Sequence, residues 1–241
     1  MTELLEPLRH GRGIVEPPRI WAQPLVVRVE RADPPDRLAA LSAAASASLA
    51  VLADPRAADE WRPALQAWLG SQIRKVARRA RGAHWQAALE LPGVTVDRAG
   101  AQVRAFPPYP VDDTPAGIRR LQVGGTELPD LVRPGLIGPG TPVLWLNPDA
   151  TMSAGKAMAQ VGHAAMLLAT YCAPDTLSRW LADGLPVAVR PAPPALWRQL
   201  TEGPADPALR WRDRRTVCVQ DAGYTEVAPG TVTVVADGSG L

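Results

Sequence analysis

The sequence predicts an α/β protein in which a mixed, mostly parallel sheet lies between helices, giving three α/β/α layers. Apolar runs of strand length alternate with helical stretches rich in Ala and Leu along most of the chain. The run 142–146 (PVLWL) is apolar throughout, which is typical of a strand covered on both faces, and a long helical stretch follows it. The same order of elements occurs in both halves of the chain, so we expect two similar halves packed as a pseudo-dimer.

The first part of the chain predicts an arm followed by a domain. Residues 1–23 show no sustained period and contain breaking prolines, so we expect a loose N-terminal arm. The first domain covers residues 24–106. Its expected elements are a strand at 25–29, an Ala-rich helix at 37–53, a helix that starts at residue 61, and a strand, turn and strand over 94–106.

Pro and Gly separate the two domains. Residues 107–141 contain PPYP, VGG, RPG and GPGTP, so we expect a linker without regular structure. The second domain covers 142–241. Its expected strands lie at 142–147, 185–190, 216–221 and 231–236, and its expected helices at 153–170, 175–183 and 194–202.

An internal repeat favours a common origin of the two domains. Two pairs of tryptophans share a spacing of 112 positions, Trp68 with Trp180 and Trp85 with Trp197. An offset of 118 aligns the strands and helices that begin each half. Under this offset Lys156, Gln160 and His163 fall on Leu38, Ser42 and Ala45. We therefore interpret the first domain as a degenerate copy of the second, with chance agreement among eight tryptophans as the alternative.

Composition excludes several classes of protein. Hydrophobic residues at 46% and charged residues at 21% are ordinary for a soluble globular domain. A net charge of +2 is too weak by itself to indicate nucleic-acid binding. The two cysteines provide neither a disulfide framework nor a metal-binding pattern. Without a signal region or an apolar run of roughly 18 residues, we expect a cytoplasmic protein with no membrane contact.

One helix carries a line of polar side chains. Ser153, Lys156, Gln160 and His163 follow one another at steps of three, four and three, which places them on one face. The rest of this helix is nearly all apolar, so most of its surface must be buried. The polar row therefore faces either solvent or a cleft.

The C-terminal segment supplies a second polar group. Asp221 ends a predicted strand, and the carboxyl ends of strands in an α/β sheet meet at the edge where ligands bind. This rule would bring Asp149, Lys156 and Asp221 together. A carboxylate can orient or deprotonate water, and a lysine can stabilise an oxyanion, so the group suits ester hydrolysis. Alternatively, Asp221 is simply a turn residue.

These two segments together resemble a known family. MSAGKAMAQVGHAA and DAGYTEVAPGTVTVV are similar to the signatures of the type-2 peptidyl-tRNA hydrolases, GK-x-x-AQ-x-x-HAA and DAG-x-T-x-x-x-PG-x-x-T. The resemblance covers about residues 142–238. The matching positions are Gly155, Lys156, Ala159, Gln160, His163, Ala164, Asp221, Ala222, Gly223, Thr225, Pro229, Gly230 and Thr233.

The resemblance implies a function and a site. Such enzymes hydrolyse the ester between a peptide and tRNA without a cofactor, and a mixed four-stranded sheet carries their site. The implied catalytic residues are Lys156, Asp221, Thr225 and Thr233, with Gln160 and His163 in support. We add Asp149 and Ser153 to the supporting residues because of their places at the sheet edge and in the polar row. This chain has Asn147 where the family usually has a basic residue, and Tyr224 where the family often has a basic or different residue. Because family members form homodimers, we expect the first half to replace the second subunit in a monomeric pseudo-dimer.

Two basic clusters are candidates for contact with tRNA. They contain Arg74, Lys75, Arg78 and Arg79 in the first half, and Arg210, Arg212, Arg214 and Arg215 in the second. Trp85 could stack on an unpaired base. By sequence position we expect the second cluster to lie nearer the site. The alternative is a solvated basic face.

The sequence thus favours a peptidyl-tRNA hydrolase that recycles tRNA. A non-catalytic tRNA- or protein-binding module is the alternative, favoured by the degenerate first half and by Asn147. All four implied catalytic positions are retained, which favours the enzyme.

Overall fold

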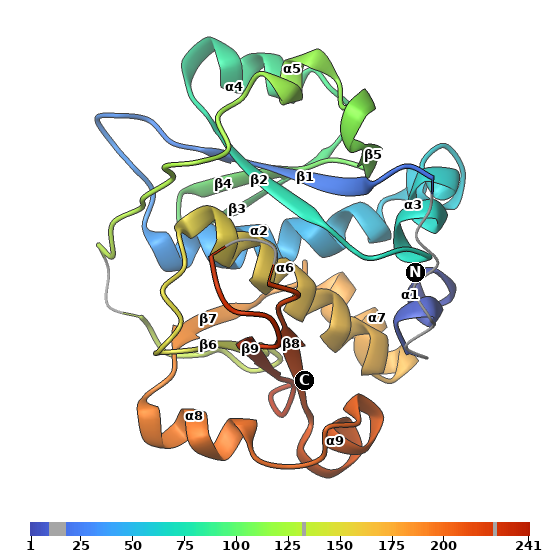
Figure 1. Ribbon diagram of the computed structural model, residues 1–241, viewed down its shortest axis with the longest axis vertical. Helices are drawn as coiled ribbons and strands as arrows, with labels where there is room; N and C mark the ends of the chain where they lie inside the picture. Colours follow the sequence, from blue (N-terminus) through green and yellow to red (C-terminus); the bar gives the residue numbers. More distant parts are fainter. Residues whose placement is uncertain (10–17, 132–133, 224–225) are drawn as a thin grey trace.

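The computed structural model describes residues 1–9, 18–131, 134–223 and 226–241 (Figure 1). Two mixed sheets lie on either side of a pair of long helices. The first sheet has the order β2-β1-β4-β3, with β5 paired to β1, and the second has the order β7-β6-β9-β8. The strands are β1 (Trp21–Arg28), β2 (Lys75–Ala80), β3 (Val94–Arg98), β4 (Ala101–Ala105), β5 (Tyr109–Pro110), β6 (Val143–Leu146), β7 (Ala188–Pro191), β8 (Thr216–Gln220) and β9 (Val232–Asp237).

The two sheets share one topology. In each, the first strand pairs in parallel with the second and antiparallel with the fourth, which in turn pairs antiparallel with the third. Three of these four strands therefore point the same way, while β4 or β9 runs against them and separates its neighbours. The predicted mixed sheet is confirmed, although only one adjacent pair in each set of four is parallel.

The long helices α2 (Arg37–Ala53) and α6 (Ala154–Tyr171) form the centre of the molecule. Each covers its own sheet and reaches the outer strand of the other, so α2 contacts β7 and α6 contacts β2. The helices cross closely at Gly162, where an added Cβ would lie 2.6 Å from Ser48 Oγ. Small residues at this crossing thus allow the halves to share one core.

Both central helices begin with a side-chain cap. The side chain of Asp36 accepts a hydrogen bond from the amide of Ala39, and that of Ser153 accepts one from the amide of Lys156. If the two capping residues are aligned with each other, the offset between the halves becomes one residue smaller than the 118 of the sequence alignment. Lys156, Gln160 and His163 then correspond to Ala39, Ala43 and Ser46.

Shorter helices cover the outer faces of both sheets. Helices α4 (Gly82–Leu89) and α5 (Ala116–Arg119) enclose Trp85 and Phe106 above the first sheet, and α8 (Pro194–Thr201) and α9 (Pro207–Arg214) lie below the second (Figure 1). Each half is therefore a three-layer α/β/α unit, as predicted. The remaining helices are α1 (Thr2–Arg9), α3 (Arg62–Leu69), α7 (Pro174–Ala182) and the 3-10 turns η1 (Pro55–Ala58) and η2 (Val111–Asp113).

Two of the expected irregular segments contain regular structure. Within the predicted loose arm, α1 buries Leu4 and Leu5, and β1 begins at Trp21. The predicted linker contains β5, η2 and α5, and it buries Ile118 and Leu121 against Trp85. Both predictions were wrong because scattered apolar residues fix these segments to the core in spite of the prolines. Residues 10–17 lie outside the described residues.

Candidate active site

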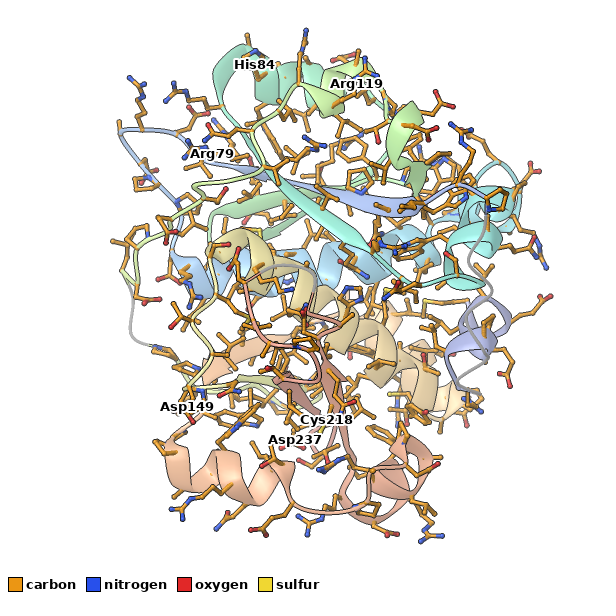
Figure 2. The ribbon with its side chains drawn as sticks, viewed as in Figure 1. Arg79, His84, Arg119, Asp149, Cys218 and Asp237 are labelled. Atoms are coloured by element: carbon orange, nitrogen blue, oxygen red, sulfur yellow. The ribbon has the colours of Figure 1, made fainter. Side chains whose placement is uncertain are left out.

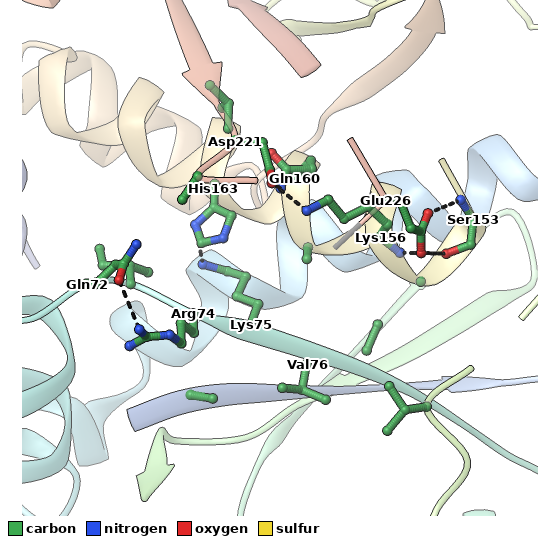
Figure 3. A pocket seen from close by; sticks show the side chains of 18 of the residues that line it. Gln72, Arg74, Lys75, Val76, Ser153, Lys156, Gln160, His163, Asp221 and Glu226 are labelled. Atoms are coloured by element: carbon green, nitrogen blue, oxygen red, sulfur yellow. Dashed lines mark hydrogen bonds and ion pairs between the residues drawn. The ribbon is translucent and has the colours of Figure 1, made fainter. Parts of the chain in front are cut away.

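A pocket of about 630 Å³ lies between the two halves (Figure 3). Its second-half wall comes from α6, the end of β8 and the loop after it. Its first-half wall comes from residues 72–77 and from the loop 123–125. The polar row of α6 therefore faces this pocket rather than bulk solvent, because the first sheet lies over the helix.

An ion pair between Lys156 and Asp221 stands in this pocket. Lys156 Nζ donates to Asp221 Oδ2, and the side chains are 11% and 7% exposed. Gln160 Nε2 donates to the same carboxylate oxygen at 2.8 Å. The pairing of Lys156 with Asp221, expected from the positions of the two motifs, is confirmed.

The loop after β8 fixes the carboxylate. The amide of Gly223 donates to Asp221 Oδ1 at 2.8 Å, and the amide of Gly230 donates to the carbonyl of Asp221 at 2.7 Å. Gly223 has a φ of +80°, and a Cβ there would lie 2.3 Å from Pro229. Only glycine fits this tight turn, so the DAG and PG elements of the motif together orient the acid.

Thr233 lies behind the ion pair. It is fully buried on β9, and its hydroxyl donates to Gln160 Oε1 at 2.6 Å. It does not line the described pocket. Thr233 is therefore linked to the ion pair through the Gln160 amide, whose N–H group donates to Asp221.

Ser153 and Glu226 form a contact at the start of α6. Ser153 Oγ and its amide donate to the two carboxylate oxygens of Glu226, each at 2.7 Å. Both residues line the pocket. Glu226 was missed by the sequence reasoning although it lies inside the quoted C-terminal motif; its place beside Thr225 was the available signal.

His163 faces a lysine from the first half. Lys75 Nζ lies 3.5 Å from His163 Nδ1 and 2.8 Å from Met166 Sδ, and it sits 4.7 Å from the centre of the Trp68 ring (Figure 3). Burial lowers the pKa of Lys75 well below its ordinary value. Burial, followed by the charges of Lys75 and Lys156, likewise lowers the pKa of His163 well below 6.5. His163 is therefore a neutral imidazole at pH 7.

Two predicted site residues are not part of this arrangement. Asp149 is exposed, its amide bonds to Asn147 Oδ1, and it does not line the pocket (Figure 2). The expectation that it joins Lys156 and Asp221 was wrong, because Asp149 lies in an exposed turn whose amide is bonded to Asn147. Thr225 and Tyr224 lie outside the described residues.

The basic residues divide into buried and exposed sets. Lys75 and Arg210 are 9% and 4% exposed, and Arg210 donates to the carbonyls of Leu200, Thr201 and Glu202 at the end of α8. Their predicted place in a surface tRNA-binding cluster was wrong, because one lies in the core and the other caps a helix. The stacking predicted for Trp85 was also wrong, since it is 2% exposed.

The other cationic side chains of the two basic clusters are at least partly exposed. Arg78 donates to the carbonyls of Arg119 and Leu121, and Arg79 bonds to Gln122 and Gly125. Arg74 lines the pocket, whereas residues 210–215 do not. The first cluster, rather than the second as expected, is therefore next to the site. Arg212, Arg214 and Arg215 are exposed at the far end of the second half.

The described ranges contain no candidate metal centre and no candidate membrane-spanning helix. No group of three or more His, Cys, Asp or Glu side chains there is arranged to hold a metal ion. Nor does any described helix have the length and apolar character required to cross a bilayer. Cys172 and Cys218 are both free thiols.

A buried lysine–carboxylate pair, supported by an amide and a hydroxyl in a pocket of an α/β protein, is an arrangement suited to acid–base chemistry. The family model described as "Peptidyl-tRNA hydrolase PTH2" matches residues 141–239. A peptidyl-tRNA hydrolase of Metallosphaera sedula is 37% identical over 103 residues, which are 41% of this chain and 85% of that relative. The chain belongs to the peptidyl-tRNA hydrolase PTH2 family, as its two motifs indicated.

Proposed function

We propose that this protein hydrolyses the ester that joins a peptide, or an N-blocked aminoacyl group, to tRNA. The observation that carries this proposal is the Lys156–Asp221 pair, whose two residues lie in the part of the chain that matches the family and line the pocket between the halves. The pair, the Gln160 amide and the Thr233 hydroxyl form one connected network. A module that only bound tRNA would not need this network, which favours the enzyme over the non-catalytic alternative.

The proposed reaction uses the two charges for different steps. The carboxylate of Asp221 accepts three hydrogen bonds in the described part of the chain, and a carboxylate can accept about four. It can therefore also hold a water molecule against the ester. The water oxygen bonds to the acyl carbon, the bond from that carbon to the ribose oxygen breaks, and the proton lost by water ends on the ribose oxygen. Lys156 stabilises the negative charge that develops on the carbonyl oxygen.

The remaining residues of the site position these groups. Gln160, held by Thr233, fixes one oxygen of Asp221, and Gly223 fixes the other. Ser153 caps the helix that carries Lys156. We assign Thr225 a place in this site from the family motif alone.

The first half completes the pocket in the proposed enzyme. In a pseudo-dimer, its β2 strand and its helix α2 occupy the places that a second subunit would take beside α6. For tRNA binding we propose Arg74 and Arg79 from the first half, with Arg78 at their side and Arg212, Arg214 and Arg215 as a more distant contact. Phosphates are bound by such side chains through charge, without sequence preference.

Release of a labelled N-acetylaminoacyl group from tRNA tests the function. We expect the wild type to release it and Lys156→Ala to be slower by roughly 10²- to 10³-fold, as for loss of an oxyanion donor. Asp149→Asn is the matched control, because Asp149 is exposed outside the pocket. Binding of tRNA without release by the wild type would reject the hydrolase and support the binding module.

A further inference from the structure

The outer edge of β2 is a part of the pocket wall that the reaction above leaves unused. We propose that this edge binds the peptide part of the substrate as an added β-strand. This inference rests on the proposed function and assigns substrate recognition to the first half. The substrate class is a tRNA that carries an extended peptide, recognised through its backbone rather than its side chains.

The pairing of β2 with β1 determines which backbone groups face the pocket. Gln23 donates to the carbonyl of Arg74, and Val29 donates to the carbonyl of Ala80. Even-numbered residues of β2 therefore bond to β1, and backbone direction alternates along a strand. The N–H and C=O groups of Lys75 and Ala77 must point away from β1.

The backbone N–H and C=O groups of Lys75 and Ala77 have no hydrogen-bond partner within the described part of the chain. The next residue of β2 that faces outward is Arg79, and its backbone amide is paired. The amide of Arg79 donates to the carbonyl of Gln122 at 3.0 Å. Lys75 and Ala77 are only 9% and 7% exposed. Backbone groups of residues with so little exposure are almost always paired, with protein, ligand or water. The pocket is the space from which such a partner can come.

The edge is fixed next to the reacting groups. Lys75, Val76 and Ala77 line the same pocket as Lys156 and Asp221 (Figure 3). The Lys75 side chain holds β2 against α6 through His163 and Met166. A strand bound at this edge would thus run beside the ion pair, which allows its terminal ester to reach Lys156.

The pocket also offers places for apolar side chains. Val111 and Val123 line it and are 49% and 48% exposed, although both are large apolar residues. Leu8 and Ile73 also lie in the wall. In a bound strand, alternate side chains would rest on this surface while the backbone pairs with Lys75 and Ala77. This arrangement suits peptides of varied sequence.

The test compares substrates that differ only in the peptide. One tRNA carries N-acetylalanine and another carries N-acetyltetraalanine, and further versions of the longer substrate have a single N-methyl group at each successive amide. We expect kcat/KM to be about tenfold higher for the longer peptide, because several weak hydrogen bonds add together. Methylation should lower kcat/KM by roughly three- to tenfold at alternate amides only, since just these face β2.

A variant of the protein tests the same strand edge by changing β2 instead of the substrate. Ala77→Pro removes an outward N–H and leaves the bonds from β2 to β1 in place. It should reduce the advantage of the long peptide over N-acetylalanyl-tRNA. Val189→Pro is the matched control, because its amide also points away from its sheet on the edge strand β7, outside the pocket.

The outcomes separate the two proposals. Rapid cleavage of the short substrate, with no effect of length or with equal effects of methylation at every amide, would overturn the edge and leave the hydrolase in place. No cleavage of any substrate would reject both. If Ala77→Pro does not fold, the alternating pattern with methylated substrates and the wild-type protein decides the question.

Discussion

Trp68 and Trp180 make the same hydrogen bond in the two halves of the protein. Trp68 Nε1 donates to the carbonyl of Arg74 at 3.0 Å, and Trp180 Nε1 donates to the carbonyl of Pro186 at 2.8 Å. In both halves the acceptor lies six residues beyond the tryptophan and just before an outer strand. Together with the shared strand order, this equivalence supports the proposed internal duplication.

The pseudo-dimer predicts a monomer in solution. In the proposed pseudo-dimer, α2 lies against α6 and takes the place of a second subunit. We expect sedimentation equilibrium to give one species of about 25.7 kDa. A concentration-independent mass twice as large would contradict this prediction.

The position of Thr233 predicts a graded effect on activity. It reaches the site through Gln160, so Thr233→Val should lower kcat by about tenfold with little change in KM, less than the loss in Lys156→Ala. Thr233→Ser retains the hydroxyl and is the control. Steady-state kinetics of the three variants check the order. Equal losses in Thr233→Val and Lys156→Ala would place Thr233 in direct contact with the substrate.

The buried imidazole predicts that acid destabilises the protein. Because the pKa of His163 is lowered in the folded state, the unfolded chain binds a proton near pH 6.5 that the folded chain does not. The free energy of unfolding should therefore fall as the pH drops below about 6.5, by at most about 1.4 kcal/mol per pH unit, until the folded-state pKa is reached.

Urea unfolding of the wild type and His163→Gln at several pH values checks this sign. The variant should lose less stability than the wild type between about pH 7 and about pH 5. Parallel curves for the two proteins would show that His163 does not carry the effect.

Two glycines of α6 predict opposite effects on stability. A Cβ at Gly162 would lie 2.6 Å from Ser48 Oγ and 2.9 Å from Lys75 Cε, whereas at Gly155 the nearest atom is 3.7 Å away. Gly162→Ala should lower the free energy of unfolding by about 1–3 kcal/mol through overpacking. Gly155→Ala should raise it by up to about 1 kcal/mol through helix propensity. Thermal melts measure both, and a stabilised Gly162→Ala would contradict the close crossing.

Arg74 and Arg210 have different surroundings, so we expect different results when each loses its charge. Arg74 lines the pocket, so Arg74→Gln should weaken tRNA binding and reduce the slope of log affinity against log salt by up to about one. Arg210 is buried on helix carbonyls, so Arg210→Gln should destabilise the fold by about 2 kcal/mol and leave the salt slope unchanged. Filter binding at several salt concentrations, with thermal melts, separates the two. An unchanged slope in Arg74→Gln would remove it from the interface.

The sequence by itself determined the elements that depend on local pattern. The α6 helix, its cap at Ser153 and its polar row follow from a period of 3.6 residues, and the Asp221 turn follows from its glycines. The pairing of Lys156 with Asp221 was also accessible, because both motifs lie at strand and helix ends that meet in α/β sheets.

Only the tertiary structure decided which residues the first half contributes. The sequence placed Lys75 in a surface cluster, whereas the pairing of β2 with β1 and the crossing of α2 over α6 bury it beside His163. Arg210 and Trp85 were misplaced for the same reason. A run of charged residues has the same appearance in the sequence whether its side chains face solvent, a core or the end of a helix. The difference arises from contacts between segments far apart in the chain, which local periodicity does not encode.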